Sequence, residues 1–180
     1  MIKLHLGCGH RDFGKDWIHI DAGNYSHLDY SNIEDLRQFE DNTVDMIYAS
    51  HVIEYFDRDE INHLLKEWKR ILKPNCTLRL AVPDFEAMSY LYSTKRISLK
   101  YILGPLYGKM KMGNMQIYHK TVYDFDEIKT VLQKNGFKDV KRFDWRKTEH
   151  FKHDDHSQAY IPHMNKNSGT LISLNVEALK

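Results

Sequence analysis

The residues Ile2-Lys3-Leu4-His5-Leu6-Gly7-Cys8-Gly9 are followed, after a short gap, by Trp17-Ile18-His19-Ile20-Asp21. This pattern predicts a buried strand, a glycine turn, a second strand and a carboxylate at the end of that strand. Glycine has no side chain, so it lets the backbone come close to a ligand. A carboxylate at the tip of the next strand is placed to accept hydrogen bonds from a ribose diol. The two segments therefore predict a site for an adenosine-containing cofactor.

The residue three positions after Gly9 separates two classes of cofactor. Dinucleotide-binding folds have a third glycine at that position, where a helix N-terminus holds the pyrophosphate. Here the residue is Asp12, and its carboxylate would repel a pyrophosphate. S-adenosylmethionine has no phosphate and carries a sulfonium cation. The sequence therefore favours S-adenosylmethionine over NAD.

Composition limits the class of protein. The chain has 180 residues, which fits one domain, and 26 basic residues balance 25 acidic ones. This balance gives no reason to expect a nucleic acid or an anionic membrane as partner. The two cysteines, Cys8 and Cys76, have no metal-binding spacing, and we expect free thiols in a reducing compartment. With no signal peptide and no apolar run long enough to span a bilayer, we expect a cytoplasmic monomer or homodimer.

Strands and helices are predicted to alternate along the chain, which is typical of an α/β fold with a mainly parallel sheet. The apolar spacing in 58–72 predicts an amphipathic helix that Pro74 stops, and a second helix follows the cap residue Asp124 and ends near Gly136. The predicted strands are 2–6, 17–20, 43–49, 77–82, 137–143 and 170–176.

Two long segments interrupt this alternation. Residues 84–121 are rich in Tyr and Met and are broken by Gly104-Pro105, Gly108 and Gly113, and residues 145–168 are polar and rich in His. Insertions of this length are usually lids or binding loops. We therefore predict one domain over residues 1–180 with a lid-like insertion at 84–121.

The order of five features resembles the class I S-adenosylmethionine-dependent methyltransferases, and most of all their small "type 11" group. The features are the turn ending at Gly9, the acidic Asp21, segment 33–36, the run from 41–45 into Ser50-His51-Val52-Ile53-Glu54, and segment 68–75 before a strand. The resemblance implies a doubly wound, Rossmann-like sheet of the seven-stranded type, with helices on both faces and an antiparallel last strand. It also implies methyl transfer from S-adenosylmethionine.

The resemblance also implies which residues hold the cofactor. The glycine turn faces the methionine and ribose parts, Asp21 binds the ribose hydroxyls, and the strand end near the sulfonium carries Ser50 and His51. The turn residues are Leu6, Gly7, Cys8 and Gly9, and the segment that flanks adenine is Glu34, Asp35 and Leu36. These positions lie at the carboxyl ends of strands, where open α/β sheets bind ligands.

The chain departs from the family pattern in three places. The interval from Gly9 to Asp21 is short for a helix between parallel strands, so we expect a loop or a single helical turn there. The usual Pro-Gly-Gly turn is Pro74-Asn75-Cys76, where Asn75 tolerates a left-handed conformation. The His that often follows Glu54 is Tyr55.

A hydroxyl acceptor of the methyl group needs a base with a pKa near neutrality. The candidates are His119, which lies where the lid meets the sheet, Asp84 at the end of the predicted strand 77–82, and His51. We favour His119. Each has a structural alternative: a histidine bonded to backbone, a turn residue after Pro83, and a histidine that shapes the cofactor pocket.

The acceptor is predicted to be a small molecule that the lid binds, such as the hydroxyl of a sugar, a nucleotide-linked sugar or a polysaccharide precursor. Tyrosines could stack on a ring and the basic side chains favour an anionic acceptor, unless Tyr and Met form a satellite core and Lys stays solvated. The residues are Tyr90, Tyr92, Tyr101, Tyr107 and Tyr118, with Lys95, Arg96, Lys100, Lys109, Lys111 and Lys120.

The sequence disfavours a nucleic-acid substrate and a metal site, and it leaves one alternative function open. The residues Ala49-Ser50-His51-Val52 stand where nucleic-acid amino-methyltransferases carry Asn/Asp-Pro-Pro-aromatic, so we expect no nucleic-acid substrate. The run His150, His153 and His156 lacks the spacing of a zinc site, and no metal is expected. The alternative function is a non-catalytic S-adenosylmethionine-binding protein with a regulatory or assembly role.

Overall fold

A six-stranded sheet forms the centre of the computed structural model, which describes residues 1–112 and 115–180. The order is β2-β1-β3-β4-β10-β7, and β10 runs antiparallel to both of its neighbours while β1, β2, β3 and β4 are mutually parallel. The predicted α/β fold, with a mainly parallel sheet and an antiparallel last strand, is confirmed. The strands are β1 (Lys3–Leu6), β2 (Ile18–Ile20), β3 (Val44–Ser50), β4 (Leu72–Pro83), β7 (Lys138–Arg142) and β10 (Ser173–Leu179).

The sheet has six strands, one fewer than the seven-stranded type implies, and β2 forms one of its edges. Beyond β2, a single parallel bridge between Ile20 and Tyr30 stands where a further edge strand would lie. The connection from β1 to β2 consists of turns, as the short interval predicts. The chain therefore reaches Asp21 from Gly9 without a crossover helix.

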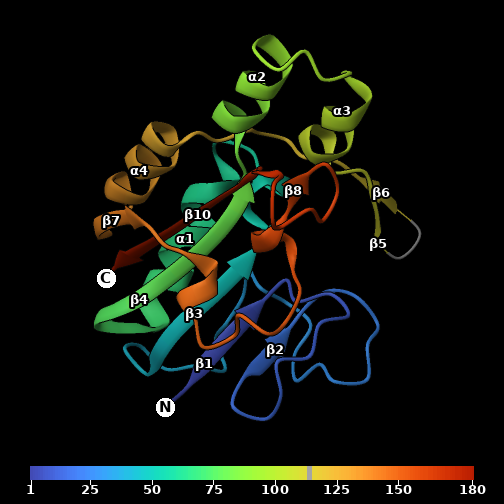
Figure 1. Cartoon of the computed structure of the whole chain (residues 1–180). Helices are drawn as coiled ribbons and strands as arrows, with labels where there is room; N and C mark the ends of the chain where they lie inside the picture. Colours follow the sequence, from blue (N-terminus) through green and yellow to red (C-terminus); the bar gives the residue numbers. More distant parts are fainter. Residues whose placement is uncertain (113–114) are drawn as a thin grey trace.

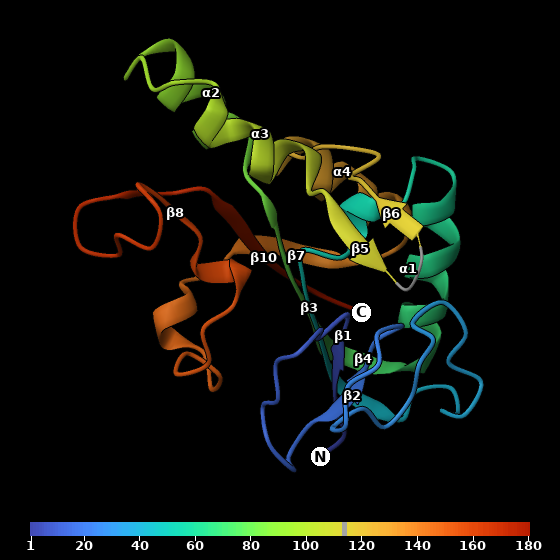
Figure 2. The ribbon, with the colours of Figure 1, turned by 90° about the vertical axis from the view of Figure 1, so that its right-hand side faces the viewer.

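Two helices, α1 (Glu60–Ile71) and α4 (Phe125–Lys134), cover one face of the sheet (Figure 2). Trp68 of α1 is fully buried, and its indole N–H donates to the carbonyl of Ile33. The predicted cap of α4 is present, because the Asp124 carboxylate accepts from the backbone N–H of Glu127 at 2.8 Å. Such a cap contributes about 1 kcal/mol. Both helices contribute to the main apolar core, α1 through Trp68 and α4 through Ile128 and Leu132.

The chain enters β4 directly from α1, five residues earlier than the sequence pattern predicts. The helix ends at Ile71, and the strand passes through Pro74 and Asn75, whose φ of 61° is the left-handed conformation expected there. The predicted strand 170–176 is also divided. Its first part, β9 (Thr170–Leu171), pairs with β8 (Tyr160–Ile161) outside the main sheet.

The other face of the sheet carries aromatic and polar side chains, and two 3-10 helices, η2 (Trp145–Lys147) and η3 (His156–Gln158), lie over it (Figure 2). Tyr48 of β3 donates a hydrogen bond to Asp155, and Asn175 of β10 donates to the carbonyl of Ser157. The His150 ring lies 4.2 Å from that of Tyr48. The His-rich segment is thus a structural cover of the sheet.

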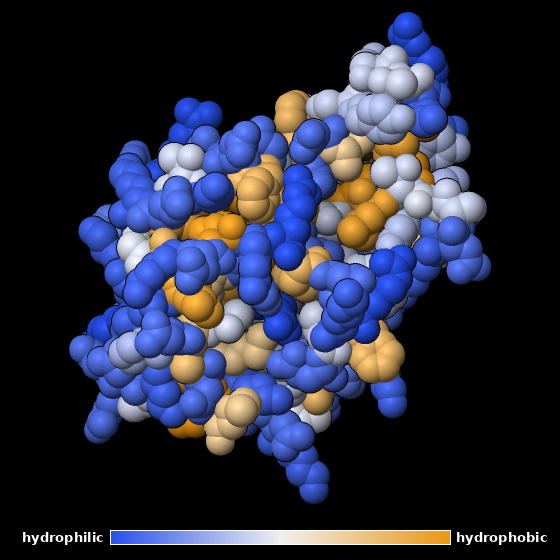
Figure 3. Space-filling model, turned by 60° about the vertical axis from the view of Figure 1, so that its left-hand side comes forward, coloured by the Kyte–Doolittle hydropathy of each residue, from blue (hydrophilic) through white to orange (hydrophobic). Residues whose placement is uncertain are grey.

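The predicted lid lies beyond the carboxyl ends of the parallel strands (Figure 1). It contains α2 (Phe85–Ser93), α3 (Lys100–Tyr107), β5 (Met110–Met112) and β6 (Met115–Ile117). Gly104-Pro105 lies inside α3, Gly108 ends that helix with a φ of 52°, and Gly113 lies outside the described residues. α2 projects from the body, and apolar side chains reach the surface beneath it (upper right in Figure 3).

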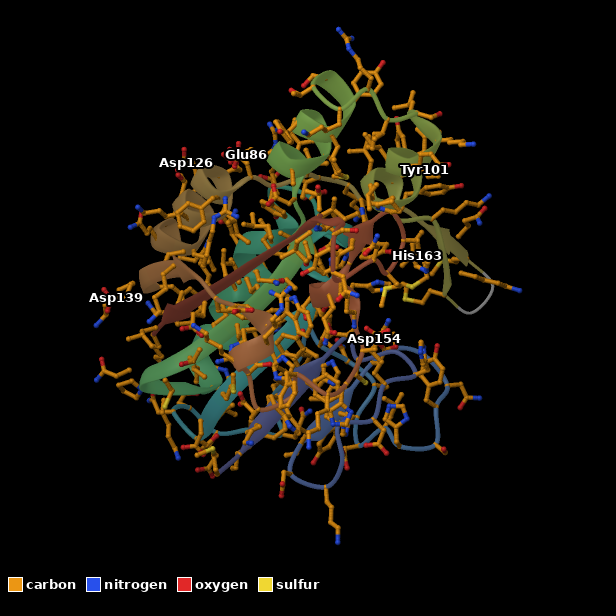
Figure 4. All side chains as sticks on the ribbon, in the orientation of Figure 1. Glu86, Tyr101, Asp126, Asp139, Asp154 and His163 are labelled. Carbon is orange, nitrogen blue, oxygen red and sulfur yellow. The ribbon has the colours of Figure 1, made fainter. Side chains whose placement is uncertain are left out.

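The lid has a small core of its own and an exposed outer surface. Met88 and Leu91 of α2 pack with Ile102 of α3 and with Ile172, which precedes β10. The tyrosines stay outside this core, and Tyr101 points away from α3 (Figure 4). Methionine therefore fills the satellite core in part, whereas the tyrosine rings remain available. Across the two described stretches of chain, no helix is long and apolar enough to cross a membrane.

The buried histidine over the second face predicts loss of stability in acid. Burial lowers the pKa of His150 from 6.5 to about 4. The unfolded chain then binds more protons between these values, so the contribution of His150 to stability is complete above pH 6.5 and is lost as the pH drops toward 4. The expected loss is about 3 kcal/mol. Urea unfolding of His150→Phe between pH 7 and 4 should show a flatter pH dependence than wild type.

The exposed His63 of α1 provides the control, and His63→Phe should follow the wild-type curve. A His150→Phe curve parallel to wild type would contradict the assignment.

Candidate cofactor and acceptor site

Two glycines with positive φ shape the turn after β1. Gly7 has a φ of 65°, its N–H donates to the Ile20 carbonyl at 2.7 Å, and an added Cβ would lie 2.3 Å from Val52 Cγ2. Gly9 has a φ of 58°, and no atom lies within 4 Å of the place of its Cβ. Gly7 is therefore required by packing, whereas Gly9 leaves open space that a ligand can approach.

The Asp21 carboxylate is held in place at the end of β2. One oxygen accepts from the N–H of Gly9 at 2.8 Å, and the other accepts from the N–H of Gly23 at 2.7 Å. Each carboxylate oxygen has a second lone pair, so both can accept one more hydrogen bond. The side chain is half-buried and oriented before any ligand binds. This arrangement fits a ribose diol beside the open turn at Gly9.

Two residues of the predicted turn can contribute only backbone atoms. Leu6 is fully buried in the main core, and Cys8 is also buried. Burial, with the nearby Asp21 carboxylate, raises the pKa of the Cys8 thiol to about 12. The thiol therefore stays protonated, and it is not a nucleophile.

The segment predicted to flank adenine is partly core. Leu36 is fully buried, and its N–H donates to the Glu67 carboxylate of α1 at 2.9 Å. Glu34 is exposed, and Asp35 forms an ion pair with Arg37. Leu36 therefore packs under α1, which leaves Glu34 and Asp35 as the members of the segment that face solvent.

The end of β3 places His51 in a fixed tautomer. His51 has a φ of 56°, and its Nε2 lies 3.3 Å from the Ser173 hydroxyl. That hydroxyl donates to Asn175 Oδ1, because the Asn175 amide nitrogen donates to another carbonyl. Ser173 must therefore accept from His51, which puts the imidazole proton on Nε2. The unprotonated Nδ1 faces Glu54 Oε1 at 3.5 Å.

His119 approaches the same carboxyl group from the lid. Its Nδ1 lies 3.2 Å from the Leu106 carbonyl, to which it donates, so Nε2 is the acceptor nitrogen. Nε2 lies 3.7 Å from Glu54 Oε1. The side chain is only 4% exposed. It packs edge-on against Tyr55, whose hydroxyl donates to the Gly108 carbonyl. The site therefore brings two of the three predicted bases together.

The residue that joins these histidines is Glu54, which the sequence reasoning did not assign to the site. Its side chain is fully buried, and neither carboxyl oxygen has a hydrogen-bond partner among the described residues. Burial raises its pKa to about 8. Burial also lowers the pKa values of His51 and His119. The available signal was a single carboxylate inside the apolar run Val52-Ile53-Glu54-Tyr55-Phe56.

Asp84, the third predicted base, has a structural task. One carboxylate oxygen accepts from the N–H of Ala87 at 3.0 Å and caps α2, and the other lies 3.5 Å from the Arg142 guanidinium. Glu86, labelled near the start of α2 in Figure 4, also pairs with Arg142. Asp84 is 6% exposed. It thus anchors the lid to β4.

The three histidines of 150–156 are separated in space. His150 stacks against Phe13, whereas the His156 ring lies 5.0 Å from that of His51. Within the described ranges, no group of three or more His, Cys, Asp or Glu side chains is arranged to hold a metal ion. A groove of about 450 Å³ lies at the opposite edge of the sheet, where Lys66, Lys69, Arg70, Lys134 and Lys180 line it, and it is separate from this site.

Comparisons with known proteins match this chain to methyltransferases and their domain. A family model described as a methyltransferase domain matches residues 19–80. A SAM-dependent methyltransferase from Archaeoglobus fulgidus has 17% identity and a TM-score of 0.58, and the match covers 99% of this chain and 86% of that one. One from Methanosarcina mazei has 18% identity and a TM-score of 0.57, with 99% and 92% covered. No curated protein sequence matches.

A third similar structure was solved with ligands. It is the 1,6-didemethyltoxoflavin-N1-methyltransferase of Burkholderia thailandensis, with bound 1,6-didemethyltoxoflavin and S-adenosylhomocysteine. Its identity is 11% and its TM-score 0.56, and the match covers 99% of this chain and 70% of that one. At these identities the likeness is one of fold, and it confirms the Rossmann-like methyltransferase architecture predicted from the sequence.

The buried Glu54 predicts a stability that falls as the pH rises from acidic to slightly alkaline values. The folded pKa of about 8 exceeds the ordinary 4.5, so between these values the folded state holds a proton that the unfolded state has lost. Stability therefore falls as the pH rises from 4.5 to 8, by on the order of 4 kcal/mol. Glu54→Gln should match wild type at pH 4.5 and be more stable at pH 8, as measured by chemical denaturation.

The exposed Glu86 gives the matched control, and Glu86→Gln should keep the wild-type pH dependence. Equal slopes for Glu54→Gln and wild type would show that Glu54 titrates normally.

Proposed function

We infer that this chain, which has the fold of the class I S-adenosylmethionine-dependent methyltransferases and a match to their methyltransferase domain, binds S-adenosylmethionine and transfers its methyl group. The observation that carries this inference is the pre-oriented Asp21 carboxylate beside the open turn at Gly9. Both lie at the carboxyl edge of the sheet, where open α/β folds bind their ligands. The cofactor, when bound, supplies an electrophilic methyl group on a sulfonium.

Each strand end has a proposed task toward this cofactor. Asp21 accepts hydrogen bonds from the ribose hydroxyls, while Gly7 and Gly9 let the backbone approach the methionine part. Glu34 and Asp35 flank the adenine, and Ser50 and His51 lie near the sulfonium. Because methyl transfer is an in-line displacement, orientation of the two reactants accounts for much of the rate.

For the acceptor, we propose a small anionic molecule bound beneath the lid, with a sugar or nucleotide-sugar hydroxyl as the atom methylated. The lid supplies exposed tyrosine rings such as Tyr101 and Tyr107, and exposed cations such as Lys109 and Lys111. Rings stack on sugars or bases, and the lysines attract negative charge. Residues His119, His51 and Asp84 are the proposed proton acceptors, with His119 favoured because it joins lid and sheet.

Loss of the Asp21 charge should weaken cofactor binding. Hydrogen bonds to a charged acceptor contribute about 1.5–3 kcal/mol. Asp21→Asn should therefore bind S-adenosylmethionine ~10- to 100-fold more weakly than wild type in calorimetric titration. Asp16→Asn, an exposed change in the preceding turn, should bind as wild type does. A failure of wild type to bind S-adenosylmethionine would refute the proposed function.

Tight binding without consumption of the cofactor, in the presence of a broad set of metabolites, would favour the non-catalytic alternative. Release of S-adenosylhomocysteine with a labelled methyl group on an acceptor would establish the enzyme.

Charge reversal in the lid tests the class of acceptor. If the acceptor is anionic, Lys109→Glu together with Lys111→Glu should raise its KM at least ~10-fold, because attraction is replaced by repulsion. The affinity for S-adenosylmethionine should stay unchanged. The same reversal at Lys134 and Lys138, which are exposed on α4 and β7, should leave the KM unchanged. An unchanged KM in the lid variant would exclude an anionic acceptor.

A further inference from the structure

Three hydrogen-bond acceptors converge on one buried point. His51 presents Nδ1 and His119 presents Nε2 to the same oxygen of Glu54, at 3.5 and 3.7 Å. The other ring nitrogen of each histidine already donates, to Ser173 and to Leu106. With Glu54 ionised, two lone pairs and a carboxylate would face each other with no donor between them. The cluster therefore holds one proton at rest on Glu54, whose nearest acceptor nitrogens are those of the two histidines.

The surroundings of the cluster favour its neutral form. Burial raises the pKa values of Tyr55 and Tyr123, and a negative charge on Glu54 would raise them further. The His156 ring lies 5.0 Å from that of His51. Burial lowers the pKa of His51, and positive charge on His156, His119 and Arg11 lowers it further. In the described part of the chain, the ion-pair partners of Glu54 are the two histidines alone. Among residues 1–112 and 115–180, no lysine or arginine forms an ion pair with Glu54.

S-adenosylmethionine would bring such a cation. Under the proposed function, its sulfonium lies near Ser50 and His51, next to the cluster. A positive charge beside a buried carboxyl group favours the ionised form, and low dielectric strengthens the effect. After transfer, the cofactor product is a neutral thioether, and the effect disappears.

We propose that binding of S-adenosylmethionine expels the proton that Glu54 holds beside His51 and His119, and that the cluster takes up the proton of the acceptor when the methyl group moves. The inference rests on the proposed function. In the transfer step, the acceptor–carbon bond forms as the carbon–sulfur bond breaks, and sulfur keeps the electron pair. The acceptor–hydrogen bond breaks, and its proton ends on the cluster. Glu54 acts through the histidines and is a proton-holding residue that does not itself contact the acceptor.

Calorimetric titration in buffers of different ionisation enthalpy measures the protons exchanged on binding. At pH 7, wild type should release up to about one proton with S-adenosylmethionine and close to none with S-adenosylhomocysteine. The difference between the two ligands isolates the sulfonium charge. Equal proton release with both ligands would overturn the inference. An absence of binding by either ligand would instead refute the proposed function, and the inference with it.

Variants at position 54 test whether Glu54 is the source of the released proton. Glu54→Gln should bind S-adenosylmethionine without proton release, Glu54→Asp should restore the release in part, and Glu86→Gln should behave as wild type. Proton release from Glu54→Gln equal to that of wild type would show that another group is the source. If Glu54→Gln does not fold, the proton release of wild type with S-adenosylmethionine and with S-adenosylhomocysteine still tests whether the sulfonium charge expels a proton.

Discussion

The close packing of Val52 on Gly7 is the constraint on which the site depends. The turn after β3 lies so near the turn after β1 that a side chain at position 7 would overlap Val52. In the turn after β1, the N–H of Gly7 donates a hydrogen bond to the carbonyl of Ile20 at the end of β2. Because parallel pairing carries the ends of β1, β2 and β3 to one edge, this contact brings Asp21, Gly9 and His51 to that edge.

The two faces of the sheet support this edge in different ways. α1 and α4 contribute a conventional apolar core that includes Trp68. The opposite face has His5, Tyr48 and Asn175, and its cover is held by hydrogen bonds and stacked rings. Such a layer is sensitive to protonation, because each buried imidazole must stay neutral. The high histidine content, unexplained by any metal pattern, is accounted for by this structural role.

The lid and the sheet meet at a group that is unfavourable for stability. The Glu54 carboxyl group is buried without a hydrogen bond, and the backbone N–H of Lys120 donates to the carbonyl of the same residue at 2.8 Å. A chain selected for stability alone would place an apolar residue there. Buried titratable groups with shifted pKa values gather at functional sites, and the position of Glu54 beneath the lid agrees with that tendency.

The sequence by itself determined the α/β class, the glycine turn, the acidic strand end and the cap of α4. Those features depend on local patterns: alternation of apolar residues, residues without a side chain, and capping at fixed spacing. Tertiary structure alone decided that His119 of the lid and His51 of β3 share Glu54, and that Asp84 anchors a helix. It also decided that β4 starts at Leu72 and that Leu36 is core. These outcomes depend on contacts between residues far apart in the chain, where burial sets the charge state, and no local pattern encodes them.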